Sequence, residues 1–176
     1  EIQEQPKAVH DTIHTYVKDN TIDLSSVGLS EEEIKEIQRI YIVACGSAYH
    51  VGITAKYVLE DLVKIPVEVD LASEFRYRNP VLVEDSLVLI ISQSGETADS
   101  LAALREAKSK GIRTLAVVNV VGSSIPREAD YVFYTLAGPE IAVATTKAYS
   151  TQLIASYLLA IQFAKVRGSI SETYYH

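Results

Sequence analysis

Short apolar runs alternate with longer stretches of helical periodicity along most of this chain. The runs over 39–44, 87–91 and 114–118 are almost continuously apolar, which is typical of strands that are buried on both faces. Two further runs, over 67–71 and 131–135, bring the number of expected strands to five. Because these strands alternate with helices, the pattern predicts an α/β fold with a parallel, roughly five-stranded sheet between two helical layers.

The segments between the runs have the spacing of helices. In 98–110 the apolar residues recur at intervals of three and four while the basic residues face elsewhere, and Gly111 suits the left-handed position that often follows a helix. The other expected helices lie over 49–62, 73–77, 123–128 and 145–166. The predicted architecture is therefore a three-layer α/β/α sandwich.

Two helical pieces precede the first expected strand, within about residues 1–38. Pro6 suits the first turn of a helix that runs to about Lys18. Ser30 followed by Glu33 is the signature of a capping box at the start of a second helix. The acidic residues around Glu33 complement the dipole of that helix, so we interpret them as part of a cap and not as a binding patch.

Composition and charge exclude several classes of protein. The chain has 176 residues, of which 48% are apolar and 22% charged, close to an ordinary globular domain. Its net charge of −7 argues against a nucleic-acid partner, because binding to phosphate backbones depends on Lys and Arg. The single cysteine, Cys45, excludes an internal disulfide and suits a reducing, cytoplasmic setting. No segment resembles a signal peptide or a membrane span, so we expect no membrane partner.

The ends of the chain predict a piece of a longer protein. The chain begins with Glu1 and contains no methionine, so we expect a fragment whose function is shared with segments outside it. The tail over 168–176 is polar and is expected to be frayed.

Hydroxyl and glycine residues gather after the carboxyl ends of the expected strands, where parallel sheets bind ligands. The richest of these segments, Ser92–Thr97, holds three hydroxyls and one glycine directly before a helix. Backbone N–H groups at a helix N-terminus bind phosphate, and Gly95 allows a close approach of the backbone. We favour a phosphate site over a simple helix cap, for which one hydroxyl would suffice.

Other motifs with a chemical meaning are incomplete. There is no Walker loop, Gly46 lacks the two further glycines of a dinucleotide fingerprint, and the glycines around Ser94 do not form a nucleophile elbow. His10 and His14 lie one helical turn apart, but no third ligand is near them in the sequence, so we expect no metal site.

Five stretches together resemble one known family. They read ACGSAYHVG, ASEFRYRNP, ISQSGETADSL, NVVGSSIPREAD and AGPEIAVATTKAYSTQ. They are similar to the isomerase part of the glucosamine-6-phosphate synthases, which are glutamine–fructose-6-phosphate aminotransferases, and within that part to the first of two sugar isomerase (SIS) subdomains. The resemblance covers essentially the whole chain and implies a single SIS domain over 1–176, of flavodoxin-like or Rossmann-like type.

The resemblance also implies which residues form a sugar-phosphate pocket. The positions that match the family's pocket are Cys45, Gly46, Ser47, Ser92, Gln93, Ser94, Thr97, Val143, Ala144 and Thr145. The family usually has serine where this chain has Ala48 and Thr145, so one pocket hydroxyl is missing and another is replaced by its homologue. The family's residues for ring opening, proton transfer and glutamine hydrolysis match positions outside this chain. We therefore expect no catalytic residue, metal or cofactor here.

The parent enzyme implied by the resemblance converts fructose 6-phosphate and glutamine to glucosamine 6-phosphate and glutamate. Its other partners would be a glutaminase domain and a second SIS subdomain of the same chain, and a second copy in a homodimer. The helix over 145–166, whose main polar breaks are Gln152 and Gln162, is expected to leave an apolar face free for self-association. The alternatives are a phosphosugar-sensing SIS module of a regulator and another phosphosugar isomerase or deglycase.

Three remaining residues invite a chemical role but have simpler interpretations. Cys45 has no basic neighbour in the sequence that would lower its pKa, so we interpret it as a buried thiol that lines the pocket. Glu96 is expected to hold the loop over 92–97, and Lys147 to have a structural role near the pocket.

Overall fold

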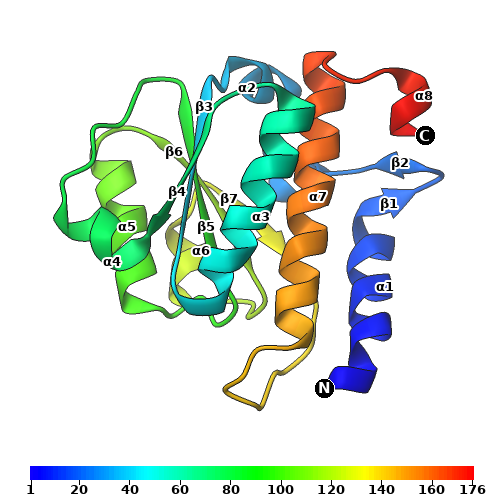
Figure 1. The fold of residues 1–176 in the computed structure, drawn as a ribbon, viewed down its shortest axis with the longest axis horizontal. Helices are drawn as coiled ribbons and strands as arrows, with labels where there is room; N and C mark the ends of the chain where they lie inside the picture. The colour runs from blue at the N-terminus through cyan, green and yellow to red at the C-terminus, as the bar shows by residue number, and fades with distance from the viewer.

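Five parallel strands form the centre of the computed structural model, which describes residues 1–176 (Figure 1). The sheet has the order β4-β3-β5-β6-β7, and its strands are β3 (Arg39–Ala44), β4 (Val67–Leu71), β5 (Ser86–Ser92), β6 (Arg113–Val118) and β7 (Tyr131–Tyr134). All four neighbouring pairs are parallel. The predicted parallel sheet and its five strands are confirmed.

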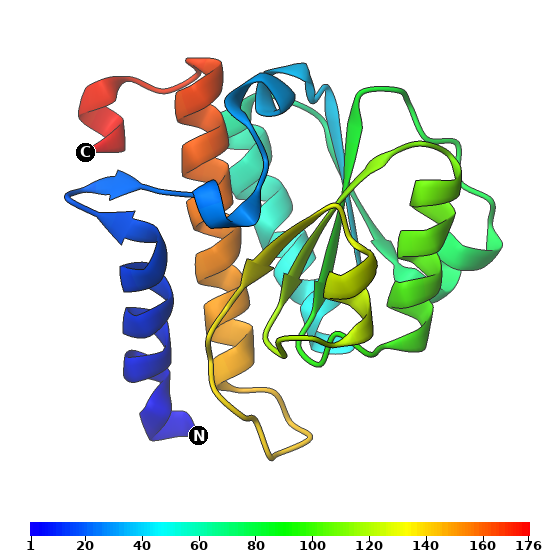
Figure 2. The same cartoon turned by 180° about the vertical axis from the view of Figure 1, so that it is seen from behind.

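Helices cover both faces of this sheet, as predicted (Figures 1 and 2). On one face lie α3 (Gly46–Val63), α7 (Lys147–Arg167) and α1 (Gln5–Tyr16). On the other face lie α4 (Ala72–Tyr77), α5 (Ala98–Ser109) and α6 (Ser124–Glu128). The architecture is therefore the expected three-layer sandwich.

Two separate apolar cores explain why the sheet must be covered on both sides. Ile40 and Ile42 of β3 belong to the core under α3 and α7, whereas Tyr41 and Val43 belong to the core under α4 and α5. Successive side chains of a strand point to opposite faces, so one continuous apolar run supplies both cores. Gly52 allows α3 to lie close to the sheet, since a Cβ atom there would be 2.9 Å from Cγ2 of Ile42.

The helix α7 lies among other helices, with eleven of its residues buried and the others half-buried. Figure 1 shows it between α3 and α1, and none of its residues is exposed. A helix with apolar residues all around needs neighbours on every side, and α1, α2 (Glu31–Glu36) and α3 provide them within this chain. The apolar residues Leu153, Ile154, Tyr157 and Ile161 are half-buried, so self-association through this helix stays a prediction.

The segment before β3 contains more than the two expected helices. The helix α1 ends at Tyr16, not near Lys18, because a hairpin of β1 (Val17–Lys18) and β2 (Thr21–Ile22) follows it. The two residues at the turn of this hairpin have φ angles of 50° and 58°, the left-handed pair that a tight hairpin turn requires.

Hydrogen bonds tie this N-terminal segment to the sheet. The Tyr16 hydroxyl donates to the Tyr134 carbonyl oxygen at 2.9 Å and accepts from the Tyr134 N–H at 3.0 Å, so the end of α1 is bonded to the edge strand β7. After a 3-10 turn, η2 (Ser25–Val27), the capping box predicted for α2 is present: the Glu33 N–H donates to Ser30 Oγ at 3.2 Å and the Ser30 N–H donates to Glu33 Oε2 at 2.8 Å.

The tail is ordered into a last helix, α8 (Glu172–Tyr175), so the expectation of a frayed end was wrong. The Tyr175 hydroxyl accepts a hydrogen bond from the Ile22 N–H at 2.7 Å and donates one to Gln162 Oε1 at 3.1 Å. These contacts join the tail to the N-terminal hairpin and to α7.

None of the helices combines the length and the apolar character that crossing a membrane requires.

Candidate functional site

A small hollow lies at the carboxyl edge of the sheet, where β3 and β5 lead into α3 and α5. Its volume is about 150 Å³, and it is lined by Cys45, Ser47, Ala48, Ile91, Ser92, Gln93, Ser94, Thr97 and Gln152. The register explains why the two loops meet here: Ala44, the last residue of β3, pairs with Ile91 near the end of β5. Six of the ten residues that match the family's pocket are therefore brought together.

Two helix N-termini face this hollow without a side-chain cap. The N-cap residues are Cys45 for α3 and Thr97 for α5, and neither side chain makes a capping hydrogen bond. Gly46 is the first residue of α3 and does not line the hollow. Uncapped N–H groups and the partial positive charge of a helix N-terminus favour an anion. The capping alternative for Thr97 is thus excluded, and the hollow has the features of an anion site.

The loop over Ser92–Thr97 is held in shape by its own hydroxyls. The Gly95 N–H donates to Ser92 Oγ at 3.1 Å, Ser92 Oγ lies 3.1 Å from Thr97 Oγ1, and the Glu96 N–H donates to Ser94 Oγ at 3.2 Å. These bonds leave the loop compact, with three hydroxyls beside the hollow.

The first residues of α6 hold this loop in place. The Ser124 N–H donates to Glu96 Oε1 at 2.7 Å, and the Ile125 N–H donates to the Gly95 carbonyl oxygen at 2.9 Å. The hydrogen bonds from Ser124 lower the pKa of Glu96. Glu96 therefore holds the loop, as predicted, and its carboxylate is directed to the backbone of the neighbouring segment.

Gly95 is required at this position for two reasons. Its φ angle is +66°, and a Cβ atom there would lie 2.0 Å from Ser123 Oγ. The positive φ angle is a left-handed conformation that costs other residues free energy. The short distance means that any side chain at this position would overlap with Ser123.

No charged side chain lines the hollow. An anion would therefore be held by neutral hydroxyls, backbone N–H groups and the two helix dipoles. Cys45 lines the hollow as expected, but its side chain is half-buried and not fully buried, with Sγ 3.8 Å from Ser100 Oγ.

Gln152 is a polar lining residue that was not predicted from the sequence. It lies in the second turn of α7, is 2% exposed, and its Oε1 atom has no hydrogen-bond partner. In the sequence it could be noticed only as a polar residue within an otherwise apolar helix.

Val143, Ala144 and Thr145 do not line the hollow. Their loop extends away from it, and Val143 is fully exposed. Ala144 is also exposed and Thr145 is half-buried. In the structure these three positions therefore lie apart from the loops after β3 and β5 that form the hollow.

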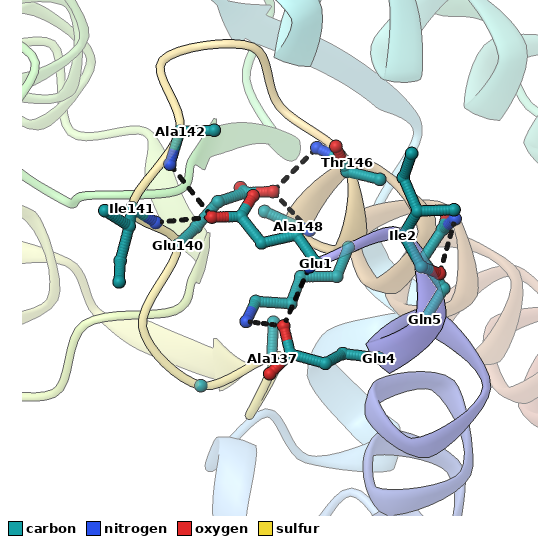
Figure 3. Close-up of polar contacts among 12 residues, drawn as sticks. Glu1, Ile2, Glu4, Gln5, Ala137, Glu140, Ile141, Ala142, Thr146 and Ala148 are labelled. Carbon is teal, nitrogen blue, oxygen red and sulfur yellow. Dashed lines mark hydrogen bonds and ion pairs between the residues drawn. The ribbon is translucent and has the colours of Figure 1, made fainter.

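Carboxylates hold this third loop in its place (Figure 3). Glu1 Oε1 accepts hydrogen bonds from the N–H groups of Ile141 at 2.8 Å and Ala142 at 2.9 Å. Glu140 Oε1 accepts one from the Thr146 N–H at 2.6 Å. The hydrogen bonds from Ala142 and Ile141 lower the pKa of Glu1.

Lys147 has the structural role that was expected of it. Its side chain is 5% exposed and its Nζ atom lies 2.8 Å from Glu4 Oε2, so it joins the start of α7 to the N-terminal segment. The hydrogen bond from Lys147 lowers the pKa of Glu4.

The two histidines of α1 stack on one another, with ring centroids 3.7 Å apart. No group of three or more His, Cys, Asp or Glu side chains is arranged to hold a metal ion.

Comparisons with known proteins agree on one type of domain. The model of the SIS domain family matches residues 33–162. An isomerizing glutamine–fructose-6-phosphate aminotransferase of Clostridium tetani is 58% identical over 98% of this chain and 28% of that protein. One of Caldanaerobacter subterraneus is 58% identical over 98% of this chain and 29% of that protein. The chain thus spans less than a third of the length of these curated relatives.

A solved structure is similar throughout the chain. The C-terminal domain of glucosamine-fructose-6-phosphate aminotransferase from Francisella tularensis has a TM-score of 0.93 and 44% sequence identity. The match covers 99% of this chain and 49% of that one.

The packing of Gly95 can be separated from its backbone conformation by two alanine variants. Gly111 has a φ angle of +72° and open space around it, so Gly111→Ala measures the conformational cost alone, about 1 kcal/mol. Gly95→Ala adds the overlap with Ser123 and should cost at least about 1 kcal/mol more. Urea unfolding of both variants gives these two free energies. Equal losses would contradict the close contact between the loop and Ser123.

The contact between Glu1 and the third loop should depend on pH. Because hydrogen bonds lower the pKa of Glu1 in the folded chain, the contact is present above that pKa and is lost as the pH falls through it. The amide NMR signals of Ile141 and Ala142 should titrate together, with a midpoint below the ordinary glutamate value. The Glu1→Gln variant is the control and should abolish this step. A midpoint at or above the ordinary value would show that the two amides do not hold the carboxylate.

Proposed function

The chain belongs to the SIS domain family, and on that premise we propose that it is the sugar-phosphate-binding subdomain of a glutamine–fructose-6-phosphate aminotransferase. The observation that best supports this proposal is the meeting of two uncapped helix N-termini and a hydroxyl-rich loop at one neutral hollow. The relatives that are 58% identical to the chain have this activity in their names. The parent reaction would convert fructose 6-phosphate and glutamine to glucosamine 6-phosphate and glutamate.

In this proposal the hollow binds the phosphate of fructose 6-phosphate or glucosamine 6-phosphate. Ser47, Ser94 and Thr97 would donate hydroxyl hydrogens to phosphate oxygens, and the first N–H groups of α3 and α5 would donate from the backbone. Hydrogen bonds to a charged group are shorter and stronger than those between neutral groups. Several such bonds can therefore bind a phosphate without Lys or Arg.

The remaining sugar contacts belong to Cys45, Gly46, Ser92, Gln93 and the loop with Val143, Ala144 and Thr145. This third loop lies away from the hollow, so its contribution requires it to approach a bound sugar. Binding would fix the position of the sugar for groups that act on it from elsewhere, which is how positioning contributes to catalysis.

The proposal places the chemistry outside this chain. A glutaminase domain and a second SIS subdomain of the same parent protein, and a second copy in a homodimer, are its proposed partners, and the cytoplasm is its proposed location. The half-buried apolar residues of α7 are the surface through which the homodimer is proposed to form. A regulator's sensing module would bind the same ligands, but the high identity to aminotransferases favours the enzyme.

Binding of fructose 6-phosphate tests the proposed site. The chain should bind it, and Ser94→Ala should weaken binding by about 1.5–3 kcal/mol, because a hydrogen bond to a charged group is lost. Isothermal titration calorimetry gives both affinities, and fructose without phosphate should bind much more weakly. Ser109→Ala, at the far end of the helix that follows the loop, is the matched control and should have no effect. Equal affinities of wild type and Ser94→Ala would contradict the assignment of this loop.

The chain alone should convert nothing. With fructose 6-phosphate and ammonia it should form no glucosamine 6-phosphate, because the positions that match the family's catalytic residues lie outside it. Mass spectrometry of the sugar products measures this. Formation of glucosamine 6-phosphate would contradict the proposal that the catalytic residues lie outside this chain. Isomerisation of fructose 6-phosphate without ammonia would instead favour another phosphosugar isomerase.

A further inference from the structure

The amide of Gln152 is a buried polar group without a partner. The residue is 2% exposed, and its Oε1 atom is shielded from solvent and accepts no hydrogen bond. Burying such a group unpaired costs free energy, so most buried polar groups have a partner in the folded chain. An unpaired amide that lines a hollow therefore calls for an explanation in terms of what the hollow holds.

The residues around Gln152 do not supply the missing partner. The hydroxyls of Ser92 and Thr97 bond to one another, and Ser92 Oγ also accepts from the Gly95 N–H. Ser156, one turn further along α7, donates to the backbone carbonyl oxygen of Gln152 and not to its side chain. The side chain is thus free to meet a group that enters the hollow.

The position of Gln152 differs from that of every other lining residue. The others come from the end of β5 and from the loops and helix starts that follow β3 and β5, whereas Gln152 comes from α7. A ligand bound to the two helix N-termini would therefore meet Gln152 as a contact from a third element. A carboxamide can turn about its last bond and offers N–H donors as well as an acceptor, and a phosphate monoester offers several acceptor oxygens.

We propose that Gln152 is a further binding residue of this site, and that its amide N–H donates to an oxygen of the phosphate of a bound sugar phosphate. This inference rests on the proposed function. In the free chain the buried, unpaired Oε1 atom lowers stability, whereas the N–H group of the same amide would bind the phosphate. Stability of the free chain and affinity for the ligand should therefore respond in opposite directions when the amide is removed.

The test uses Gln152→Leu, which keeps the size of the side chain and removes its polar group. The variant should raise the Tm of the free chain by about 2–4 °C and weaken binding of fructose 6-phosphate about tenfold in calorimetric titration. Gln152→Glu should weaken binding further, because it places a negative charge beside the phosphate. Gln162→Leu is the matched control: it makes the same change on the same helix at a residue whose Oε1 is bonded to Tyr175, and it should leave affinity unchanged.

The failures of the two proposals can be told apart. If the wild-type chain does not bind fructose 6-phosphate, the proposed function is wrong. If the wild type binds and Gln152→Leu changes the affinity less than threefold, the function stands and the role of Gln152 is wrong.

A measurement on the wild type covers the case in which the leucine variant does not fold. The side-chain NH₂ signals of Gln152 in ¹⁵N spectra should move when fructose 6-phosphate is added, while those of Gln162 stay in place. Unmoved Gln152 signals at saturating ligand would overturn the inference.

Discussion

The parallel pairing of β3 with β5 is the constraint on which the rest of the site depends. It places Ala44 beside Ile91, so that the two strands end at the same level and the helices that follow them begin side by side. Because the two strands are continuously apolar, both faces of the pair must be covered, and helices on each side cover them. One stretch of sequence pattern therefore determines both the core and the direction in which two helix N-termini point.

A neutral site follows from this arrangement. The chain has a net charge of −7, and no basic side chain lines the hollow. In the proposed function, selectivity for an anion would therefore have to come from oriented N–H groups, hydroxyls and helix dipoles. Such groups keep their orientation only if the loop is rigid. The connection between β6 and β7 holds the loop rigid. Its residues Ser124 and Ile125 donate hydrogen bonds to the loop, and its residue Ser123 lies in close contact with Gly95.

The sequence predicted those parts of the molecule that depend on local pattern. The five strands of the central sheet, the layers, the capping box of Ser30 and the hydroxyl-rich loop could be inferred from periodicity and composition, whereas the hairpin of β1 and β2 was not predicted. The ordered tail and the cover of α7 could not, because they depend on contacts between distant residues, such as those of Tyr175 with Ile22 and Gln162. Gln152 was visible as a polar break, but its meeting with the loops after β3 and β5 is a property of the tertiary structure.

The loop with Val143 shows how a site can depend on a segment far away in the sequence. Its backbone is held by the carboxylate of Glu1, and the start of the following helix is held to Glu4 through Lys147. Any approach of this loop to the hollow must either break the two hydrogen bonds to Glu1 or carry the N-terminal segment along with it. In the proposed function, the free energy of the sugar contacts that this loop would make has to offset the free energy of these bonds. The N-terminal segment, which has no residue in the hollow, thereby influences how readily the loop can reach it.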